Sequence, residues 1–597
     1  MNNLKKISFL LSYKERLQAI LLLVMTLIMA LIDMLGVASI LPFIALITNP
    51  EILETNIILK NIYLTSKSFG VETKQDFLII AGIVVFLLLI ISISFKALTT
   101  YIQIRYIKTC EYSIAMRLIN GYLHQTYSWF LNRNSSILGK SILSEVSNVV
   151  SRGLMPLMSL ITNSFITLTL FGLLLFTEPK ITFIAIITIS LFYALVYKLN
   201  LNLLNKIGKE VFNANEERYK ISSEAFGAFK EIKIGDLEET YIKQFSSPSK
   251  SIAKNSALWS VLNQVPRFAL EAVAFGGMLL IVLFFMTITG DITKVLPIIA
   301  LYAFAGYRLI PALQKIYISF TSLHYVGPAL DSLHNDLRNL KPNVQNIHKD
   351  SLKLKNNICL KNIHYSYPNS SKTALKNINL IIPANKTIGL VGATGSGKTT
   401  TIDIILGLLE AQKGTLEIDG TVININNIRA WQRSIGYVPQ QIFLADNTVS
   451  SNIAFGVNID DINQEAVEKA AKIANLHEFI INELPLKYQT TVGERGIRLS
   501  GGQRQRIGIA RALYHKPKIL VLDEATSALD NLTEKSVMNA IKSLENNITK
   551  ILVAHRLSTV RYCDNIYLFD KGELKSQGTF DELIKISDDF RESAKNS

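Results

Sequence analysis

Long apolar runs mark the first half of the chain and are missing from the second half. Six of them precede residue 320, at roughly 17–47, 77–97, 154–176, 181–198, 265–289 and 294–320. Each is near or above the ~20 residues that an α-helix needs to cross a bilayer core, and each contains few charges. Only Thr177 to Lys180 separates the third run from the fourth, and Gly290-Asp291 joins the fifth to the sixth. The pattern predicts six transmembrane helices, of which two pairs form tight hairpins.

Some segments between these runs are long, basic and short of helix-breaking residues. Residues 98–153 and 199–264 hold many Lys and Arg, whereas the opposite connections are short or mixed in charge. Because positive charge stays on the inner side of a membrane, these segments and both chain ends are predicted to be cytoplasmic. A helix extended by ~25 residues would project about 40 Å at 1.5 Å per residue. We therefore predict long helical extensions suited to transmitting motion from the cytoplasm.

Two shorter stretches have amphipathic patterns. Residues 1–16 interleave basic and apolar side chains, which predicts a helix on the inner membrane surface, with a disordered tail as the alternative. In the loop 48–76, apolar residues recur at roughly helical spacing: Leu53, Ile57, Ile58, Ile62 and Tyr63. This spacing predicts an external helix that lies along the membrane.

The pattern becomes that of an α/β domain after a polar stretch. We assign residues 1–330 to a transmembrane domain with cytoplasmic helical extensions, 331–349 to a linker and 350–597 to a second domain. In the second domain, short β-rich runs such as 387–391 and 519–522 alternate with helical stretches. The predicted fold is a polytopic α-helical membrane domain plus an α/β phosphate-loop domain.

Composition supports a membrane protein. Hydrophobic residues make up 49 % of the chain and the mean hydropathy is +0.28, which is high for a soluble protein of 597 residues. The net charge of +15 would also suit a nucleic-acid binder. Since Lys and Arg flank the apolar runs, we attribute the charge to membrane orientation and expect no nucleic-acid partner.

A glycine-rich loop joins the β-rich run 387–391 to a helical stretch. Such loops converge their N–H groups on phosphates, and the helix N-terminus adds partial positive charge. Lys398 is placed to reach the β- and γ-phosphates of ATP, and the Thr399 hydroxyl is placed to bind Mg²⁺. The predicted ATP-binding residues of this loop are Gly392, Thr394, Gly395, Ser396, Gly397, Lys398, Thr399 and Thr400.

Two adjacent carboxylates end the second β-rich run. Asp523 follows the buried run 519–522 and is a candidate Mg²⁺ ligand. Glu524 is then placed to polarise the attacking water as a general base. The alternative is that the two acids end a strand and have no catalytic role. The presence of the phosphate loop disfavours this alternative.

Further motifs resemble those of ABC transporter ATPases. Leu499-Ser500-Gly501-Gly502-Gln503 matches the family signature LSGGQ, and the resemblance covers about residues 355–585. It implies that Gln440 senses Mg²⁺ and water, that His555 contacts the γ-phosphate, and that Tyr367 stacks on adenine. Residues 527–530 match the D-loop and 493–496 an exporter-specific segment, although Thr491 stands where exporters often have an acid.

The resemblance implies an ATP-hydrolysing ABC exporter that works as a dimer with ATP and Mg²⁺ as cofactors. One chain carries one ATPase domain and six spans, which is half of a working exporter. The signature residues Ser500, Gly501, Gly502 and Gln503 are expected to complete the ATP site of a second copy. A homodimer with two competent sites is the simplest arrangement, and a heterodimer stays open.

Ionisable residues within the apolar runs suggest what is transported. Lys96, Arg267 and Arg308 could line the inner half of a central cavity and attract an anionic head group. The alternative is that Asp33 and Glu271 pair with arginines inside the helix bundle.

These features, with the strings 266–271 and 307–311, resemble the bacterial flippases of lipid-linked oligosaccharides; lipid A flippases are also similar. The expected substrate is therefore a lipid-linked pyrophosphate oligosaccharide or another anionic amphiphile, moved across the bacterial inner membrane. Alternatives are an exporter of a peptide, a toxin or lipid A, a non-transporting ATPase regulator, and a soluble DNA-associated ABC ATPase.

Overall fold

The structure is a computed structural model of the full chain. It describes residues 2–48, 57–67, 73–177, 179–289, 292–340, 351–368, 370, 372–525, 530–542, 544, 547–554 and 556–595. Its contacts divide the chain into two compact units. The first contains residues 1–125 and 133–343, and the second contains 126–132 and 344–597. Each unit is considered by itself.

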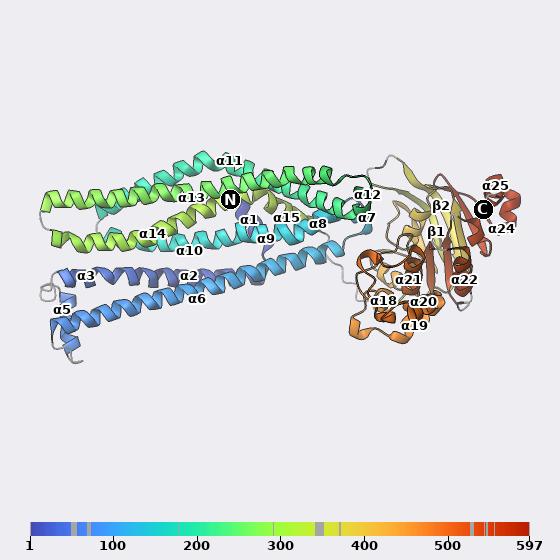
Figure 1. Ribbon diagram of the computed structural model, residues 1–597, viewed down its shortest axis with the longest axis horizontal. Helices are drawn as coiled ribbons and strands as arrows, with labels where there is room; N and C mark the ends of the chain where they lie inside the picture. The colour runs from blue at the N-terminus through green and yellow to red at the C-terminus, as the bar shows by residue number, and fades with distance from the viewer. Residues whose placement is uncertain are drawn as a thin grey trace. The chain divides into compact units, whose positions relative to one another are not determined.

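The first unit is built from helices throughout its described residues (Figure 1). They are α1 Asn2–Leu10, α2 Tyr13–Ala38, α3 Ile40–Thr48, α5 Ile57–Lys67, α6 Lys74–Leu123, α8 Ser135–Lys140, α9 Val146–Val149, α10 Met155–Thr177, α11 Pro179–Gly227, α12 Phe229–Ile234, α13 Glu238–Thr289, α14 Ile292–Tyr325 and α15 Gly327–Asn339. Two π-helical turns, η1 Ser141–Glu145 and η2 Val150–Leu154, join α8, α9 and α10.

All six predicted spans fall on helices. Four continuous stretches of the described residues are long and apolar enough to cross a membrane: Tyr13–Thr48, Lys74–Leu123, Ser135–Thr177 and Thr182–Gly227. The fifth and sixth predicted spans lie on α13 and α14, while the turn residues Glu178, Gly290 and Asp291 lie outside the described part.

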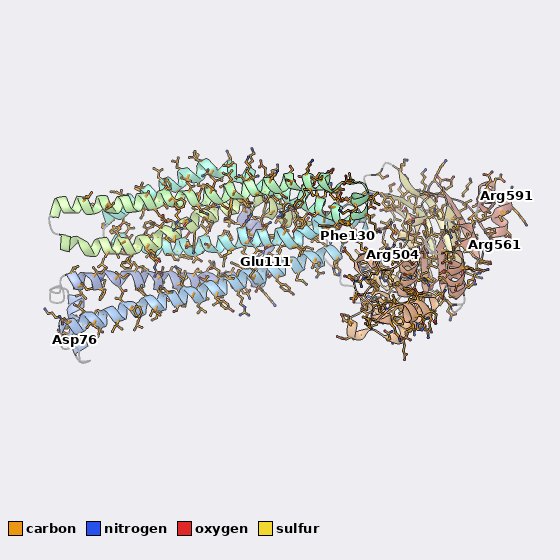
Figure 2. All side chains as sticks on the ribbon, viewed as in Figure 1. Asp76, Glu111, Phe130, Arg504, Arg561 and Arg591 are labelled. Atoms are coloured by element: carbon orange, nitrogen blue, oxygen red, sulfur yellow. The ribbon has the colours of Figure 1, made fainter. Side chains whose placement is uncertain are left out.

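The predicted helical extensions are confirmed. Helices α6, α11 and α13 contain 50, 49 and 52 residues. At 1.5 Å per residue each is about 75 Å long, well beyond the ~30 Å of a bilayer core. Figure 2 marks Asp76 near the start of α6 and Glu111 farther along the same helix.

The N-terminal stretch forms the predicted amphipathic helix, but protein covers much of its apolar face. Ile7 and Leu10 of α1 are 2 % and 1 % exposed, and α1 packs against α15. Lys6 makes an ion pair of 2.5 Å with Asp331. Helix α15 continues to Asn339, inside the predicted linker, and residues 341–350 lie outside the described part.

The helix predicted in the loop 48–76 is also present, and its external position stays a prediction. Helix α5 includes four of the predicted apolar residues, while Leu53 lies outside the described part. The Tyr63 ring packs edge-on against Phe77 of α6 with centroids 5.3 Å apart, whereas Ile62 is 51 % exposed. The helix therefore has one side against protein and one side open.

The second unit contains two sheets. The strands are β1 Asn357–Ser366, β2 Thr373–Pro383, β3 Thr387–Gly392, β4 Lys413–Ile418, β5 Thr421–Val422, β6 Ile435–Val438, β7 Ile519–Asp523, β8 Thr549–Val553, β9 Asn565–Asp570 and β10 Glu573–Gly578. The antiparallel sheet has the order β2-β1-β4-β5, and the larger sheet has the order β10-β9-β3-β8-β7-β6. Within the larger sheet β9, β3, β8, β7 and β6 are parallel.

The helices of the second unit are α16 Lys398–Ile405, α17 Ile428–Gln432, α18 Val449–Ile453, α19 Gln464–Ile473, α20 His477–Glu483, α21 Gly501–Tyr514, α22 Asn531–Lys542, α23 Leu557–Val560, α24 Phe580–Ile586 and α25 Asp588–Lys595. Of these, α16, α21, α23 and α24 contact strands of the larger sheet. All five residues of β7 are buried, as expected of a central parallel strand. Carboxyl ends of parallel strands meet at one sheet edge, so β3 and β7 deliver their following loops to the same side.

Candidate functional site

The glycine-rich loop lies between β3 and α16, as the sequence predicts. Gly397 caps α16 with φ at +105°, a backbone conformation that favours glycine. A Cβ atom at this position would lie 2.7 Å from the Leu375 side chain. The Lys398 ammonium group donates hydrogen bonds of 2.8 and 3.0 Å to the carbonyl oxygens of Gly392 and Ala393, across the loop. Lysine and backbone thus enclose the place where phosphates would bind.

The polar groups of the loop fit a phosphate chain. Ser396 is 3 % exposed and its hydroxyl has no hydrogen-bond partner among the residues that the structure describes. A buried unsatisfied hydroxyl is costly unless a ligand completes it. Thr399 is exposed at the helix start, so its hydroxyl is free to reach a metal ion bound with the phosphates. These are the donors that ATP requires.

The predicted adenine-stacking residue lies beside the loop helix. The Tyr367 hydroxyl is 3.1 Å from the Thr400 hydroxyl, and the Tyr365 ring packs edge-on against it at 5.2 Å. Tyr367 is only partly buried, which leaves part of its ring accessible to a base. Its stacking role remains a prediction.

The two carboxylates stand at the end of β7. Asp523 is 3 % exposed, and Glu524 adopts a left-handed backbone conformation with φ at +50°. Gln440 donates a hydrogen bond of 2.7 Å from its side-chain amide to the Glu524 carboxylate. Strained backbone at a sheet edge is typical of functional sites, so the geometry supports a hypothesis of catalysis by Glu524.

Burial shifts the pKa values of the ionisable groups around the loop. It lowers the pKa of Lys398, while the carboxylates of Glu524 and Asp523 act in the opposite direction. Burial, and then the negative charge of Asp523, raises the pKa of Asp403 to about 6. Asp403 lies on α16 and sequence reasoning missed it, because only the fold shows that this carboxyl group is buried.

The signature residues open α21. Ser500 is the N-cap, and it forms a reciprocal capping box with Gln503: the Gln503 N–H donates to the Ser500 hydroxyl at 3.2 Å. The Ser500 N–H donates to the Gln503 side chain at 2.8 Å. Gly501 and Gly502 form the first turn, where N–H groups have no partner within the helix. This end can therefore donate to an anion.

His555 and residues 527–529 of the predicted D-loop, 527–530, lie outside the described residues. Described residues that follow each of these gaps in the chain are joined by hydrogen bonds. Glu534 of α22 accepts hydrogen bonds from Arg556 at 3.1 Å and from the Thr559 hydroxyl at 2.9 Å. These bonds join α22 to the segment that follows His555, a connection without a signal in the sequence.

One short helix from the membrane half belongs to the second unit. Helix α7, Tyr127–Leu131, follows α6 in the chain and clusters with the ATPase residues. Burial raises the pKa of Tyr127, and the charges of Asp403 and Tyr367 add to this effect. Tyr127 therefore lies close to the loop helix that carries the phosphate-binding residues.

In the first unit, the predicted cavity arginines both have carboxylate partners. Arg308 pairs with Asp33, which is 1 % exposed and accepts a hydrogen bond of 2.9 Å from Ser92. Arg267 pairs with Glu271 at 2.7 Å, one turn along α13. The pairing of acids with arginines was the alternative considered from the sequence.

Lys96, the third predicted cavity residue, is half-buried on α6. Lys315 of α14 lies within electrostatic range of it. Sequence reasoning missed Lys315, although it stands two turns after Arg308 on the same helix.

Comparisons with known proteins identify both units. Residues 54–307 match the ABC transporter transmembrane region, and residues 375–527 match the ABC transporter family of ATPases. A solved bacterial Atm1-family ABC exporter with ATP bound superposes with a TM-score of 0.77 at 20 % identity over 98 % of both chains. The chain is an ABC exporter. The predicted fold class, with a membrane domain and an ATPase domain in one polypeptide, is confirmed.

Two of the curated relatives match over about four fifths of the chain, and a third matches over a shorter part. The heterocyst differentiation ATP-binding protein HepA of Nostoc is 29 % identical over 84 % of this chain and 82 % of its own. An ATP-dependent lipid A-core flippase of Methylobacillus flagellatus is 28 % identical over 79 % of this chain and 81 % of its own. The lipid A-core flippase of Saccharophagus degradans is 43 % identical over 39 % of each chain. The predictions of an ATP-driven exporter and of ATP binding are thereby confirmed.

Proposed function

We propose that the exporter is a flippase that moves an anionic amphiphile from the inner to the outer leaflet of a bacterial inner membrane. A lipid-linked pyrophosphate oligosaccharide is the substrate that fits best. The observation that carries this proposal is the presence of three basic residues within apolar spans, Lys96, Arg267 and Arg308, although Arg267 and Arg308 each also have a carboxylate partner. Cations in hydrocarbon are costly and mark substrate paths by default, and phosphate groups are their natural ligands.

The phosphate loop would supply the energy by binding ATP. Lys398 would exchange its bonds to Gly392 and Ala393 for the β- and γ-phosphates, since both are oxygen acceptors within its reach. Thr399, Asp523 and Gln440 would hold Mg²⁺, which neutralises charge developing on the phosphates. Glu524 would accept a proton from water, and its bond to Gln440 would orient it. His555 would contact the γ-phosphate.

A second copy of the chain would complete each site. The donors at the start of α21 come from Ser500, Gly501, Gly502 and Gln503, and we propose that they bind ATP held by the phosphate loop of the other subunit. Since the chain retains Lys398, Asp523 and Glu524, both sites of a homodimer would hydrolyse ATP. Closing of the two ATPase domains would then rearrange the membrane helices.

Transport can be tested with purified exporter in liposomes. A polyprenyl-diphosphate oligosaccharide with a fluorescent sugar is placed in both leaflets, and its protection from an external quencher is followed. Wild-type protein should move the lipid only when ATP and Mg²⁺ are present, and Glu524→Gln protein should not move it. The proposal would be refuted if the protein hydrolyses ATP but moves no lipid, and if no anionic lipid stimulates this hydrolysis.

Lipid A is a second candidate because several relatives carry the name ATP-dependent lipid A-core flippase. Lipid A is also an anionic amphiphile, so the same basic residues would suit it. A panel that compares ATPase stimulation by polyprenyl-diphosphate sugars, lipid A and peptides separates the two substrates. Stimulation by a peptide alone would favour the peptide exporter instead.

A further inference from the structure

A pocket of the ATPase unit lies away from the phosphate loop. Its lining includes Thr387, the first residue of β3, together with Lys550 and Leu552 of β8. The phosphate loop follows the carboxyl end of β3, whereas Thr387 and Lys550 lie near the amino ends of their strands. Because β3 and β8 are parallel, the pocket lies toward the opposite edge of the larger sheet.

The pocket also lies on the other face of that sheet. Side chains alternate along a strand, so Lys550 and Leu552 point to one face of β8 and Ile551 to the other. Leu552 belongs to the same core cluster as Ile541 of α22. Ile551 belongs instead to the cluster that contains Ile402 of α16, the helix that follows the phosphate loop. The sheet therefore separates the pocket from the ATP site.

Two elements that follow predicted catalytic motifs line the pocket. Lys542 is the last residue of α22, the helix that follows the predicted D-loop. Thr559 and Tyr562 come from the segment that follows His555. The Thr559 hydroxyl already donates a hydrogen bond of 2.9 Å to Glu534 of α22. A ligand in the pocket would thus touch two elements that are connected to each other.

Lys550 brings a buried positive charge to this pocket. The residue is 7 % exposed, although lysine is rarely buried unless it is paired. Its ammonium group donates one hydrogen bond of 3.4 Å, a long one, to the Lys542 carbonyl oxygen at the end of α22. Since an ammonium group has three N–H donors, this bond leaves most of its capacity for a ligand.

The nearby acids have other partners. Asp564 pairs with Lys386 at 3.2 Å, and Glu534 pairs with Arg556 at 3.1 Å. Among the residues that the structure describes, no carboxylate lies within ion-pair distance of either lysine of the pocket. Burial lowers the pKa of Lys550, while the charge of Asp564 acts in the opposite direction.

Lys542 supplies a second positive charge. Its ammonium group lies 3.2 Å from the centroid of the Tyr562 ring, which attracts the cation and holds it beside the pocket. Two like charges that line one pocket repel each other. An anion between them would remove this repulsion.

The size of the pocket favours a small oxyanion. Its space of about 310 Å³ includes a part that is open to solvent, and sites for drug-sized ligands begin at about 300 Å³. Ammonium groups bind phosphate as point charges, without a fixed geometry. Inorganic phosphate is such an oxyanion, and the ATPase domain releases it when it hydrolyses ATP.

We propose that Lys542 and Lys550 form a second phosphate site, which binds the inorganic phosphate produced by ATP hydrolysis. Lys550 donates to the ion from the buried side of the pocket, and Lys542 neutralises it from the exposed side. The bound ion would connect the end of α22 with the segment that follows His555. This site does not depend on what the exporter transports.

The test uses full-length exporter in detergent that carries Lys398→Ala, which removes the phosphate-loop lysine and its competing site. Binding of labelled inorganic phosphate is measured by equilibrium dialysis for this parent and after addition of Lys542→Gln, Lys550→Met or both. Lys550→Met keeps an unbranched apolar side chain in the buried position. Lys469→Gln on α19 is the matched control, because it removes an exposed cation of the same unit outside the pocket.

The Lys398→Ala parent should bind phosphate, and the double lysine variant should bind it at least about tenfold more weakly. Lys469→Gln should leave the affinity unchanged. Without phosphate, Lys550→Met should unfold at the same temperature as the parent or higher, because it removes a buried charge that has no carboxylate partner. Phosphate should raise the unfolding temperature of the parent but not of the double variant, relative to chloride at equal ionic strength.

Three results overturn the inference. If the parent binds no phosphate, or if the double variant binds it as tightly as the parent does, the pocket is not a phosphate site. If chloride raises the unfolding temperature as much as phosphate, the effect is screening of surface charge. If phosphate-free Lys550→Met unfolds at a clearly lower temperature, Lys550 acts by supporting the end of α22, and the unpaired charge on which the site rests is refuted.

Discussion

Replacing Asp403 by Asn should stabilise the ATPase unit at neutral pH. The side chain is 8 % exposed and lies near the negative charge of Asp523. Burial and this neighbouring charge raise its pKa from 3.8 to about 6. The folded protein therefore holds the proton more tightly than the unfolded chain. The stability that protonated Asp403 contributes is complete below about pH 4 and is lost as the pH rises through about 6.

The magnitude follows from the shift. About two pKa units correspond to about 3 kcal/mol, so ionised Asp403 destabilises the fold by at most this amount at pH 7.5. Asparagine cannot ionise, and Asp403→Asn should recover much of that free energy of unfolding. At pH 4.5 the gain should fall to about 1 kcal/mol, because most of the wild-type carboxyl groups are protonated in the folded state.

Urea unfolding of the full-length exporter in detergent measures this difference. Of its three tryptophans, Trp129 and Trp431 belong to the second unit and Trp259 to the first. A Trp259→Phe background therefore makes the fluorescence report on the ATPase unit alone. The comparison is made at pH 7.5 and pH 4.5, without nucleotide.

Asp419 provides a control of opposite sign. Burial would raise its pKa, but backbone N–H groups of Lys355, Asn356 and Asn357 donate to the carboxylate at 2.8, 2.8 and 2.9 Å and lower the pKa overall. Asp419→Asn should therefore lose stability at pH 7.5, and lose less as the pH falls through the folded pKa. An Asp403→Asn protein whose stability relative to wild type does not depend on pH would refute the reasoning.

Three other replacements test the site and the fold. Glu524→Gln should slow ATP hydrolysis about 100-fold or more while nucleotide affinity stays within a few-fold, measured by phosphate release and fluorescent-nucleotide binding; an equal loss of binding would contradict a role as base. Gly397→Ala should weaken nucleotide binding about tenfold or more in the same binding assay, since φ of +105° and the nearby Leu375 side chain strain any Cβ atom; unchanged affinity would exclude this constraint. In the wild-type chain the buried Lys140 and Glu145 form an ion pair of 3.5 Å. Lys140→Met should destabilise the first unit by about 3–5 kcal/mol in unfolding experiments, because it leaves the Glu145 carboxylate buried without its cation. Adding Glu145→Gln should restore most of the loss, and a double variant as unstable as the single one would contradict the pairing.

The local elements that carry the predicted ATP site follow from the sequence alone. The phosphate loop needs only a strand, glycines and a helix start, all contiguous between Thr387 and Ile405. Asp523 ends the buried strand β7 after four apolar residues and Glu524 follows it, and the capping pair Ser500 and Gln503 is three residues apart. Such features depend on neighbouring residues, so periodicity and motif spacing are sufficient to find them.

Features that depend on distant contacts could not be decided in this way. The sequence offered pairing of Asp33 with an arginine only as an alternative, and the packing of α2 against α14 brings Asp33 and Arg308 together. The same holds for buried Asp403 and for α7, which clusters with the ATPase residues although it follows a membrane helix. Lys315 was missed for a simpler reason: without the pairing of Arg308, nothing singles it out from other basic residues.

Two π-helical turns lie near the start of the helical stretch Ser135–Thr177, before the third predicted span, and they have a geometric consequence. A π turn contains one residue more than an α turn, and each added residue rotates the following helix by about 100°. Below the turns, Lys140 contacts Glu216 of α11, and within the second turn Arg152 stacks on Trp259 and Tyr325. Beyond them, α10 packs against α2 and α14. The inserted residues thus rotate one end of this continuous helix about its axis relative to the other end. Each end can therefore turn its contact face toward its own neighbouring helices.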